Sequence, residues 1–90
     1  MKEVQFNREK DKVLLEKRGI GFEDIKQALE NGKLLNVVKH PNSKRYPRQK
    51  MFLIELNNYV FMVPFIEERE YIFLKTIIPS RKYTKKYLKK

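Results

Sequence analysis

The stretch that decides the fold is MFLIELNNYVFMVPF, residues 51–65, in which two apolar and aromatic runs meet at Asn57 and Asn58. Asparagine tolerates the left-handed backbone conformation that tight hairpin turns require. The pattern therefore predicts a β-hairpin whose two strands cover residues 51–56 and 59–65.

The segments after the hairpin predict one more strand and a basic helix. After an acidic turn over 67–70, the run 71–78 carries apolar residues on both of its alternating faces, with Leu74 and Ile78 on the same face, which is typical of a central strand. Pro79 and Ser80 then begin a final helix that contains no acidic residue. Along one side of this helix we expect Tyr83, Tyr87 and Leu88.

The spacing of apolar residues before the hairpin favours helices. Asn7 is a good N-cap, and Gly19 can take the positive φ angle at which helices often end. The elements expected here are a short edge strand over 3–6, helices over 8–18 and 22–31, and a strand over 34–38. The fold class is therefore α+β in the order β-α-α-β-β-β-β-α, with a mostly antiparallel sheet packed on two N-terminal helices and a C-terminal basic helix.

Length and composition favour a single domain over 1–90. Ninety residues, of which 41% are hydrophobic, can bury one modest core. The chain contains no cysteine, which excludes a disulfide framework, a thiolate metal site and a cysteine nucleophile. No apolar run has the length of a signal peptide or a membrane span, so we expect a cytoplasmic protein with no membrane partner.

Charge is the strongest functional signal, because the formal net charge of +10 is concentrated in two segments. Residues 39–50 carry five basic and no acidic side chains, and residues 75–90 carry seven basic and no acidic side chains. Such segregation is typical of proteins that bind a polyanion. For the end of the second segment, the alternative is a solvated tail that only aids solubility.

The first basic segment interleaves cations with the only histidine of the chain and with a tyrosine. Lys and Arg neutralise phosphates, Tyr can stack on a base, and His titrates near neutral pH and can move a proton. The alternative is a mobile loop with unselected polar residues. The candidate catalytic residues here are His40, Lys39, Arg45 and Arg48, and the candidate RNA-binding residues are Lys44, Tyr46 and Lys50.

The second basic segment places positive charges in the first turn of its helix, where negative charges are usual. Ser80 is a good N-cap, but Arg81 and Lys82 stand in the first turn, where the helix dipole favours anions. These cations and the free backbone N–H groups would bind a phosphate, so Arg81 is a further catalytic candidate. The alternative is a tail helix held by its tyrosines, with solvated lysines. The RNA-binding candidates of this segment are Lys75, Ser80, Lys82, Lys85 and Lys86.

Other chemistries find little support in the sequence. It has no glycine-rich phosphate loop, no paired-histidine zinc spacing and no nucleophile elbow, and its carboxylates are scattered. A nuclease of this composition is therefore expected to need no metal and no other cofactor. Such RNA cleavage uses the 2′-hydroxyl of the substrate as nucleophile, and the protein supplies a base, an acid and cations.

Two stretches, Lys17–Ile25 and Pro79–Lys82, resemble the most recognisable stretches of the BrnT-like toxins, which are members of the RelE-type ribonuclease fold. The resemblance implies a type II toxin that cleaves RNA without metal, inhibits translation and is neutralised by a cognate antitoxin, often of the ribbon-helix-helix type. Only Ser80, Arg81 and Lys82 are carried over as motif positions. The chain departs from the family pattern at Phe6–Asn7 (usually Trp-Asp), Arg18 (often His) and Tyr83 (commonly Glu).

Two other functions are compatible with the sequence. A non-catalytic RNA- or ribosome-binding module would need the same two basic segments but no proton-transfer group. An interaction protein would dock its basic faces on an acidic partner. The feature that favours the second is the aromatic-rich sheet, although the regular alternation of these aromatic residues favours core packing.

Overall fold

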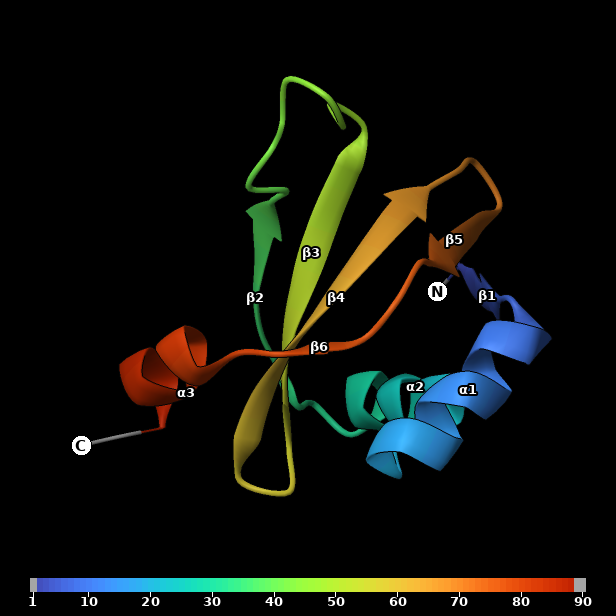
Figure 1. Ribbon diagram of the computed structural model, residues 1–90. Helices are drawn as coiled ribbons and strands as arrows, with labels where there is room; N and C mark the ends of the chain where they lie inside the picture. Colours follow the sequence, from blue (N-terminus) through green and yellow to red (C-terminus); the bar gives the residue numbers. More distant parts are fainter. Residues whose placement is uncertain (1, 89–90) are drawn as a thin grey trace.

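The computed structural model describes residues 2–88, which form three helices and a mixed six-stranded sheet (Figure 1). Lys89 and Lys90 of the second basic segment lie outside the described residues. The α+β class is confirmed, and one short strand is added to the expected order. None of the described helices has the length and apolar character that a membrane crossing demands. The elements are β1 (Glu3–Phe6), α1 (Arg8–Arg18), α2 (Phe22–Glu30), β2 (Leu34–Lys39), β3 (Gln49–Leu56), β4 (Tyr59–Glu67), β5 (Tyr71–Leu74), β6 (Ile78–Pro79) and α3 (Arg81–Tyr87).

The sheet is built around the predicted hairpin, which is confirmed. Strands β3 and β4 pair antiparallel along their whole length, and Asn57 and Asn58 take positive φ angles of 55° and 63° in the turn. The order across the sheet is β1-β5-β4-β3-β2, and β6 also pairs with β4. All pairs are antiparallel except β1 with β5. The expectation of a mostly antiparallel sheet is therefore confirmed.

The two N-terminal helices begin and end close to the predicted residues. The Asn7 Oδ1 atom accepts the backbone N–H of Lys10 at 3.0 Å, and α1 ends at Gly19, whose φ is 71°. A carboxylate oxygen of Asp24 accepts the N–H of Gly21 at 2.8 Å in the first turn of α2. These caps fix the short connection between α1 and α2.

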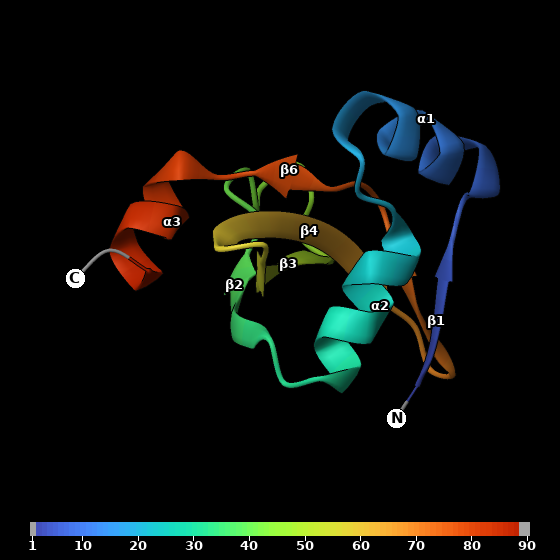
Figure 2. The same cartoon turned by 90° about the horizontal axis from the view of Figure 1, so that it is seen from below.

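One face of the sheet packs against α2 and forms the core, to which α1 contributes Leu14. Phe22 and Ile25 of α2 and Leu14 of α1 are buried in one cluster with Phe52 and Phe65 of the hairpin. The rings of Phe52 and Phe65 are stacked, with 3.9 Å between their centroids. Figure 2 shows α2 on this side of the curved sheet. Burial of these aromatic and aliphatic side chains supplies the main stabilisation of the fold.

The prediction of one central strand over 71–78 is wrong, because this segment divides into β5 and β6. In β5, Leu74 stands opposite Phe65 of β4, whereas in β6, Pro79 stands opposite Phe61. The pairing with β4 has therefore shifted by one residue between the two strands. A shift of one residue exchanges the faces to which all later side chains point.

Pro64 of β4 provides the physical reason for this shift. Its carbonyl oxygen accepts the N–H of Lys75 at 2.8 Å, but proline has no N–H with which to complete the antiparallel pair. The ladder breaks at this point and resumes at Ile78, with its register shifted by one residue. Ile77 consequently joins the core and is only 1% exposed, whereas Ile78, predicted to share a face with Leu74, is 38% exposed.

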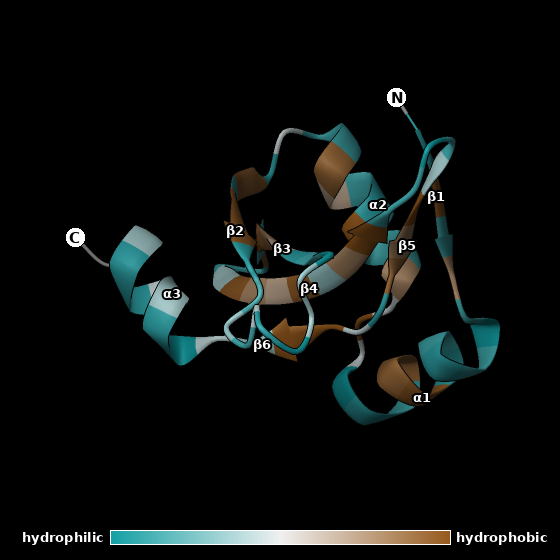
Figure 3. Ribbon diagram, turned by 90° about the horizontal axis from the view of Figure 1, so that it is seen from above, coloured by the Kyte–Doolittle hydropathy of each residue, from teal (hydrophilic) through white to brown (hydrophobic). Residues whose placement is uncertain are grey.

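We refer to the side of the sheet opposite the core as the open face. Alternation along β3 and β4 places Met51, Leu53 and Met62 on the open face, and Ile78 of β6 stands beside Met62. Helices α3 and α1 flank this face, whereas α2 lies on the other side of the sheet (Figure 3). Met51 and Leu53 are buried on this face, Met62 is half-buried, and Ile78 is 38% exposed.

Candidate nucleic-acid interface

The basic loop, residues 40–48, joins β2 to β3 and is closed by its own hydrogen bonds. The backbone N–H of His40 donates to the carbonyl oxygen of Gln49 at 3.3 Å, and that of Tyr46 donates to the carbonyl oxygen of Asn42 at 2.9 Å. The sequence predicts a polar loop over 40–49, but Gln49 already belongs to β3. The loop is thus shorter than predicted, and backbone hydrogen bonds define the turn from which its side chains project.

His40 and Tyr46 form the centre of the basic loop. Their ring centroids are 4.8 Å apart, and the guanidinium carbon of Arg45 lies 5.6 Å from the centroid of the Tyr46 ring. The backbone N–H of Asn42 donates to the Nδ1 atom of His40 at 3.0 Å, so the neutral imidazole carries its proton on Nε2. The Nε2 atom is therefore the one that can exchange a proton with a ligand.

Lys39 and Lys50 face each other across the last register pair of β2 and β3. Together with Ser43, Pro47 and Gln49 they line a hollow of about 280 Å³. Like charges that stand directly opposite are unfavourable without an anion between them, so this pair favours phosphate binding. Alternation places both lysines on the core side of the sheet.

Arg48 is held by a residue outside the basic segment. Its guanidinium forms a 3.1 Å ion pair with Glu68, which lies in the acidic turn between β4 and β5. The Arg48 side chain is still 72% exposed, so the pair is reached by solvent and by ligands. Lys44 also lies exposed in the same loop.

The predicted N-cap of the final helix is confirmed, and it has a structural role. The Ser80 side chain is buried, and its Oγ atom accepts the N–H of Tyr83 at 3.1 Å. Its own N–H donates to the carbonyl oxygen of Val60, and its carbonyl oxygen accepts the hydroxyl of Thr84 at 2.7 Å. The hydroxyl of Ser80 is therefore occupied within the fold, whereas the side chains of Arg81 and Lys82 at this end of α3 are exposed.

Helix α3 is fixed to β4 and presents its cations to solvent. The hydroxyl oxygen of Thr84 accepts the N–H of Val60 at 2.9 Å, which ties the middle of the helix to the central strand. Tyr83, Tyr87 and Leu88 are half-buried on one side, as the spacing predicted. The residues on the other side are exposed, namely Arg81, Lys82, Lys85 and Lys86.

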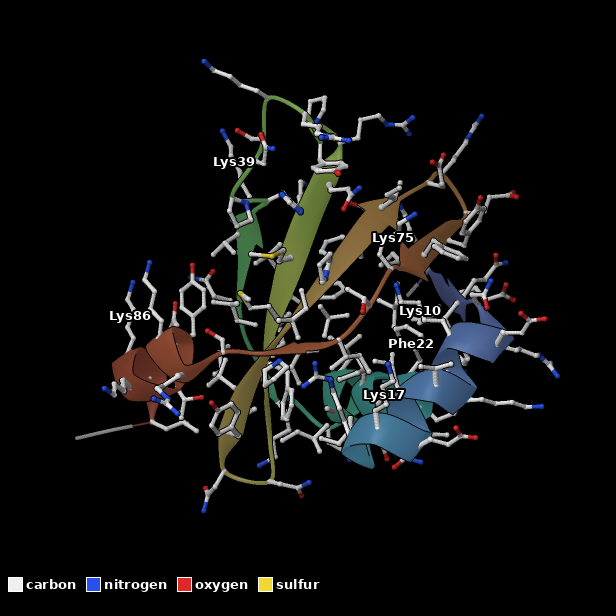
Figure 4. The ribbon with its side chains drawn as sticks, viewed as in Figure 1. Lys10, Lys17, Phe22, Lys39, Lys75 and Lys86 are labelled. Carbon is white, nitrogen blue, oxygen red and sulfur yellow. The ribbon has the colours of Figure 1, made fainter. Side chains whose placement is uncertain are left out.

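A contact between α3 and β2 brings the two basic segments to the same region of the molecule. The amide Nδ2 of Asn36 donates a 3.0 Å hydrogen bond to the hydroxyl of Tyr87. Lys39, the last residue of β2, and His40, the first of the basic loop, follow Asn36 by three and four positions, which corresponds to roughly 10–13 Å of extended chain. Figure 4 shows Lys39 and Lys86 on the same side of the molecule. The sequence carried no signal for this contact, because a single asparagine in a strand has many uses.

Helix α3 thus lies beside the open face and the basic loop lies at the end of β2 and β3, with aromatic rings beside several of the cations (Figures 1 and 3). Lys82 and Lys86 lie 5.7 Å from the ring centroids of Tyr83 and Tyr87, respectively. Within residues 2–88, no three His, Cys, Asp or Glu side chains gather into a group that would hold a metal ion. Comparisons of the chain with protein-family models, curated proteins and solved structures found no match.

Proposed function

We propose that this protein is a metal-independent endoribonuclease that acts as the toxin of a type II toxin-antitoxin system, with a RelE-like fold of the BrnT-like kind. The observation that carries the proposal is the hydrogen bond between Asn36 and Tyr87, which holds the basic helix beside the strand that leads into the basic loop. An RNA strand on the open face can then contact both cationic segments at once. The proposed site of action is translated RNA in the cytoplasm.

The chemistry needs only groups that these two segments contain. The 2′-hydroxyl of the RNA loses its proton and attacks the phosphorus, the bond to the 5′-oxygen breaks, and that oxygen takes up a proton. In this proposal Arg81 holds the scissile phosphate, Arg45 stabilises the charge on its oxygens, and Nε2 of His40 moves a proton. Lys39 is the other proton-transfer candidate. Arg45 is favoured over Arg48, because Arg48 is already engaged in an ion pair.

A cognate antitoxin is the proposed protein partner, of the ribbon-helix-helix type found with the family that the chain resembles. Strand β2 is the last strand on its side of the sheet within the described residues, and Leu34 and Val37 on it are exposed. An exposed strand edge can pair with a strand of another chain. An acidic partner would also neutralise the basic segments on either side of β2.

Inducible expression in a bacterial host tests the toxin proposal. The native chain is compared with Arg81→Ala and with Arg69→Ala, a control that removes an exposed arginine outside both basic segments. We expect growth arrest and loss of RNA integrity with the native chain and with the control, and relief of both with Arg81→Ala. Full activity of Arg81→Ala, or normal growth with intact RNA when the native protein is folded and abundant, would contradict the proposal.

A non-catalytic RNA- or ribosome-binding module is the second candidate function. It is favoured by the pairing of cations with aromatic rings, as at Arg45 and Tyr46, because such pairs bind bases and phosphates whether or not a bond is cleaved. Incubation of the purified protein with RNA in the presence of a chelator separates the two functions. Cleavage supports the nuclease, and retention of intact RNA supports the binding module.

A further inference from the structure

A second basic and aromatic site lies at the opposite side of the open face from α3. A hollow of about 450 Å³ lies between α1 and β5. Its lining combines a half-buried aromatic ring, two lysines and one exposed valine, but also one carboxylate. The lining residues are Asn7, Glu9, Lys10, Val13, Phe73 and Lys75.

Phe73 and Lys75 supply one wall of this hollow. Phe73 lies opposite Ile66 of β4, on the open face, and its ring is half-buried. The Nζ atom of Lys75 lies 5.6 Å from the centroid of the Phe73 ring. An aromatic ring with a cation beside it can stack a nucleic-acid base and bind the adjacent phosphate.

One side of α1 supplies the other wall. Lys10, Val13 and Lys17 follow one another at the spacing of a single helix face, and Val13 is 46% exposed although it is apolar. Figure 4 shows Lys75, Lys10 and Lys17 one below another beside the sheet. Charge counting did not select Lys10, because residues 1–38 carry nearly balanced charge.

The strand register connects this hollow with the basic loop. Gln49, at the end of the loop, stands opposite Ile66, and Ile66 stands opposite Phe73, so the three side chains form one row across the open face. Two strand spacings separate Gln49 from Phe73, which is about 10 Å. A single extended strand of RNA that contacts the basic loop can therefore continue across this row to the hollow.

We propose that the hollow between α1 and β5 is a second binding subsite for single-stranded RNA, in which Phe73 stacks a base while Lys10 and Lys75 bind flanking phosphates. This subsite extends the RNA surface of the proposed function and rests on it. Glu9 opposes phosphate binding there and limits the affinity. The combination of an aromatic platform with cations favours RNA over an acidic protein, for which cations alone would suffice.

Binding of a 2′-O-methylated single-stranded RNA, which cannot be cleaved through its 2′-oxygen, tests the subsite. We expect Phe73→Leu to weaken binding by about tenfold, because the stacking platform is lost. Lys10→Gln, which changes an exposed residue, is expected to lower the slope of log Kd against log salt by about one. Glu9→Gln is expected to tighten binding, and Lys12→Gln, an exposed lysine on another side of α1, to leave the salt slope unchanged.

The outcomes separate the subsite from the proposed function. If the native chain binds RNA but neither Phe73→Leu nor Lys10→Gln changes affinity or salt slope, the subsite is refuted and the proposed function stands. If the native chain does not bind RNA at low salt, the proposed function itself fails. If Lys10→Gln weakens binding to polyglutamate but not to RNA, the hollow is a docking site for an acidic protein and the proposal of an RNA subsite is overturned.

Discussion

Asn36 in β2 and Tyr87 in α3 are 51 positions apart in the sequence, and the amide of the first donates a 3.0 Å hydrogen bond to the hydroxyl of the second. A helix of seven residues is too short to be stable by itself, so α3 depends on its contacts with the sheet. Three contacts hold it, namely the Asn36–Tyr87 bond, the Ser80 cap and the bond from Val60 to Thr84. The arrangement of the two basic segments depends on the same contacts.

Tyr87→Phe removes the hydroxyl that receives the Asn36 amide. Because both groups reach solvent, we expect the free energy of unfolding to fall by only about 0.5–1 kcal/mol, whereas amide hydrogen exchange in the last turn of α3 should become faster. Combining Tyr87→Phe with Asn36→Ala should add nothing further to the exchange rate, since each change breaks the same bond. Additive effects in this double-mutant cycle would mean that the bond does not hold the helix.

Ser80 and Arg81 are adjacent but should respond in opposite ways to substitution. Ser80→Ala removes a buried cap, and we expect it to lower the free energy of unfolding by about 1 kcal/mol. Arg81→Ala removes an exposed side chain, so stability should stay within about 0.5 kcal/mol of the native value while RNA cleavage suffers its largest loss. Thermal unfolding and cleavage assays on both variants check this. Unchanged stability of Ser80→Ala would show that the cap is unimportant for α3.

Local features of the fold were predictable, whereas those set by distant residues were not. The hairpin turn at Asn57 and Asn58 and the caps at Asn7 and Ser80 depend on neighbouring residues, so the sequence predicted them. The division of 71–78 depends on Pro64, which lies on another strand, and no pattern within 71–78 reports the missing N–H of that proline.

The candidate site likewise has features that the sequence predicts and features that it does not. The two basic segments follow from counting charges along the chain, and their candidate residues were predicted. The pairing of Arg48 with Glu68 and the approach of Lys10 to Lys75 arise from the order of strands and could not be predicted. The sequence therefore predicted which charged residues form the candidate surface, but not which residues from other parts of the chain lie beside them.

Glu67 and Lys2 form a 2.8 Å ion pair that makes stability depend on acid pH. The hydrogen bond from Lys2 and its positive charge lower the pKa of Glu67 below its usual value of 4.5. A carboxyl whose pKa is lower in the folded state contributes stability above the pKa of the unfolded chain, and this contribution is lost as pH falls through the folded pKa. We expect Glu67→Gln to flatten the fall of the melting temperature below about pH 4.5, and a slope identical to that of the native protein would contradict this.

Glu68 pairs with Arg48 and competes with ligands for its positive charge, so removal of Glu68 should strengthen RNA binding. We expect Glu68→Gln to tighten RNA binding several-fold at low salt, because Arg48 becomes free and one negative charge near the loop is removed. The pair is exposed, so stability should change by less than about 0.5 kcal/mol. The matched control is Glu70→Gln, which removes an equal charge from the same turn without breaking an ion pair in the described structure. Equal effects of the two changes would indicate a general charge effect and no specific role for the Arg48 pair.

His40 provides the sharpest distinction between a nuclease and a binding module. The bond from the Asn42 N–H occupies Nδ1, so only Nε2 can exchange a proton with RNA, while the ring also contacts Tyr46. We expect His40→Gln to reduce kcat by about tenfold or more while KM changes little, because glutamine keeps a polar side chain but cannot act as an acid or base. Tyr46→Leu should instead raise KM, because it removes a surface for base stacking without removing a proton-transfer group. If His40→Gln keeps the full kcat, His40 is not catalytic and Lys39 remains as the proton-transfer group. If the native protein does not cleave RNA and both variants lose RNA binding, the loop is a binding element alone.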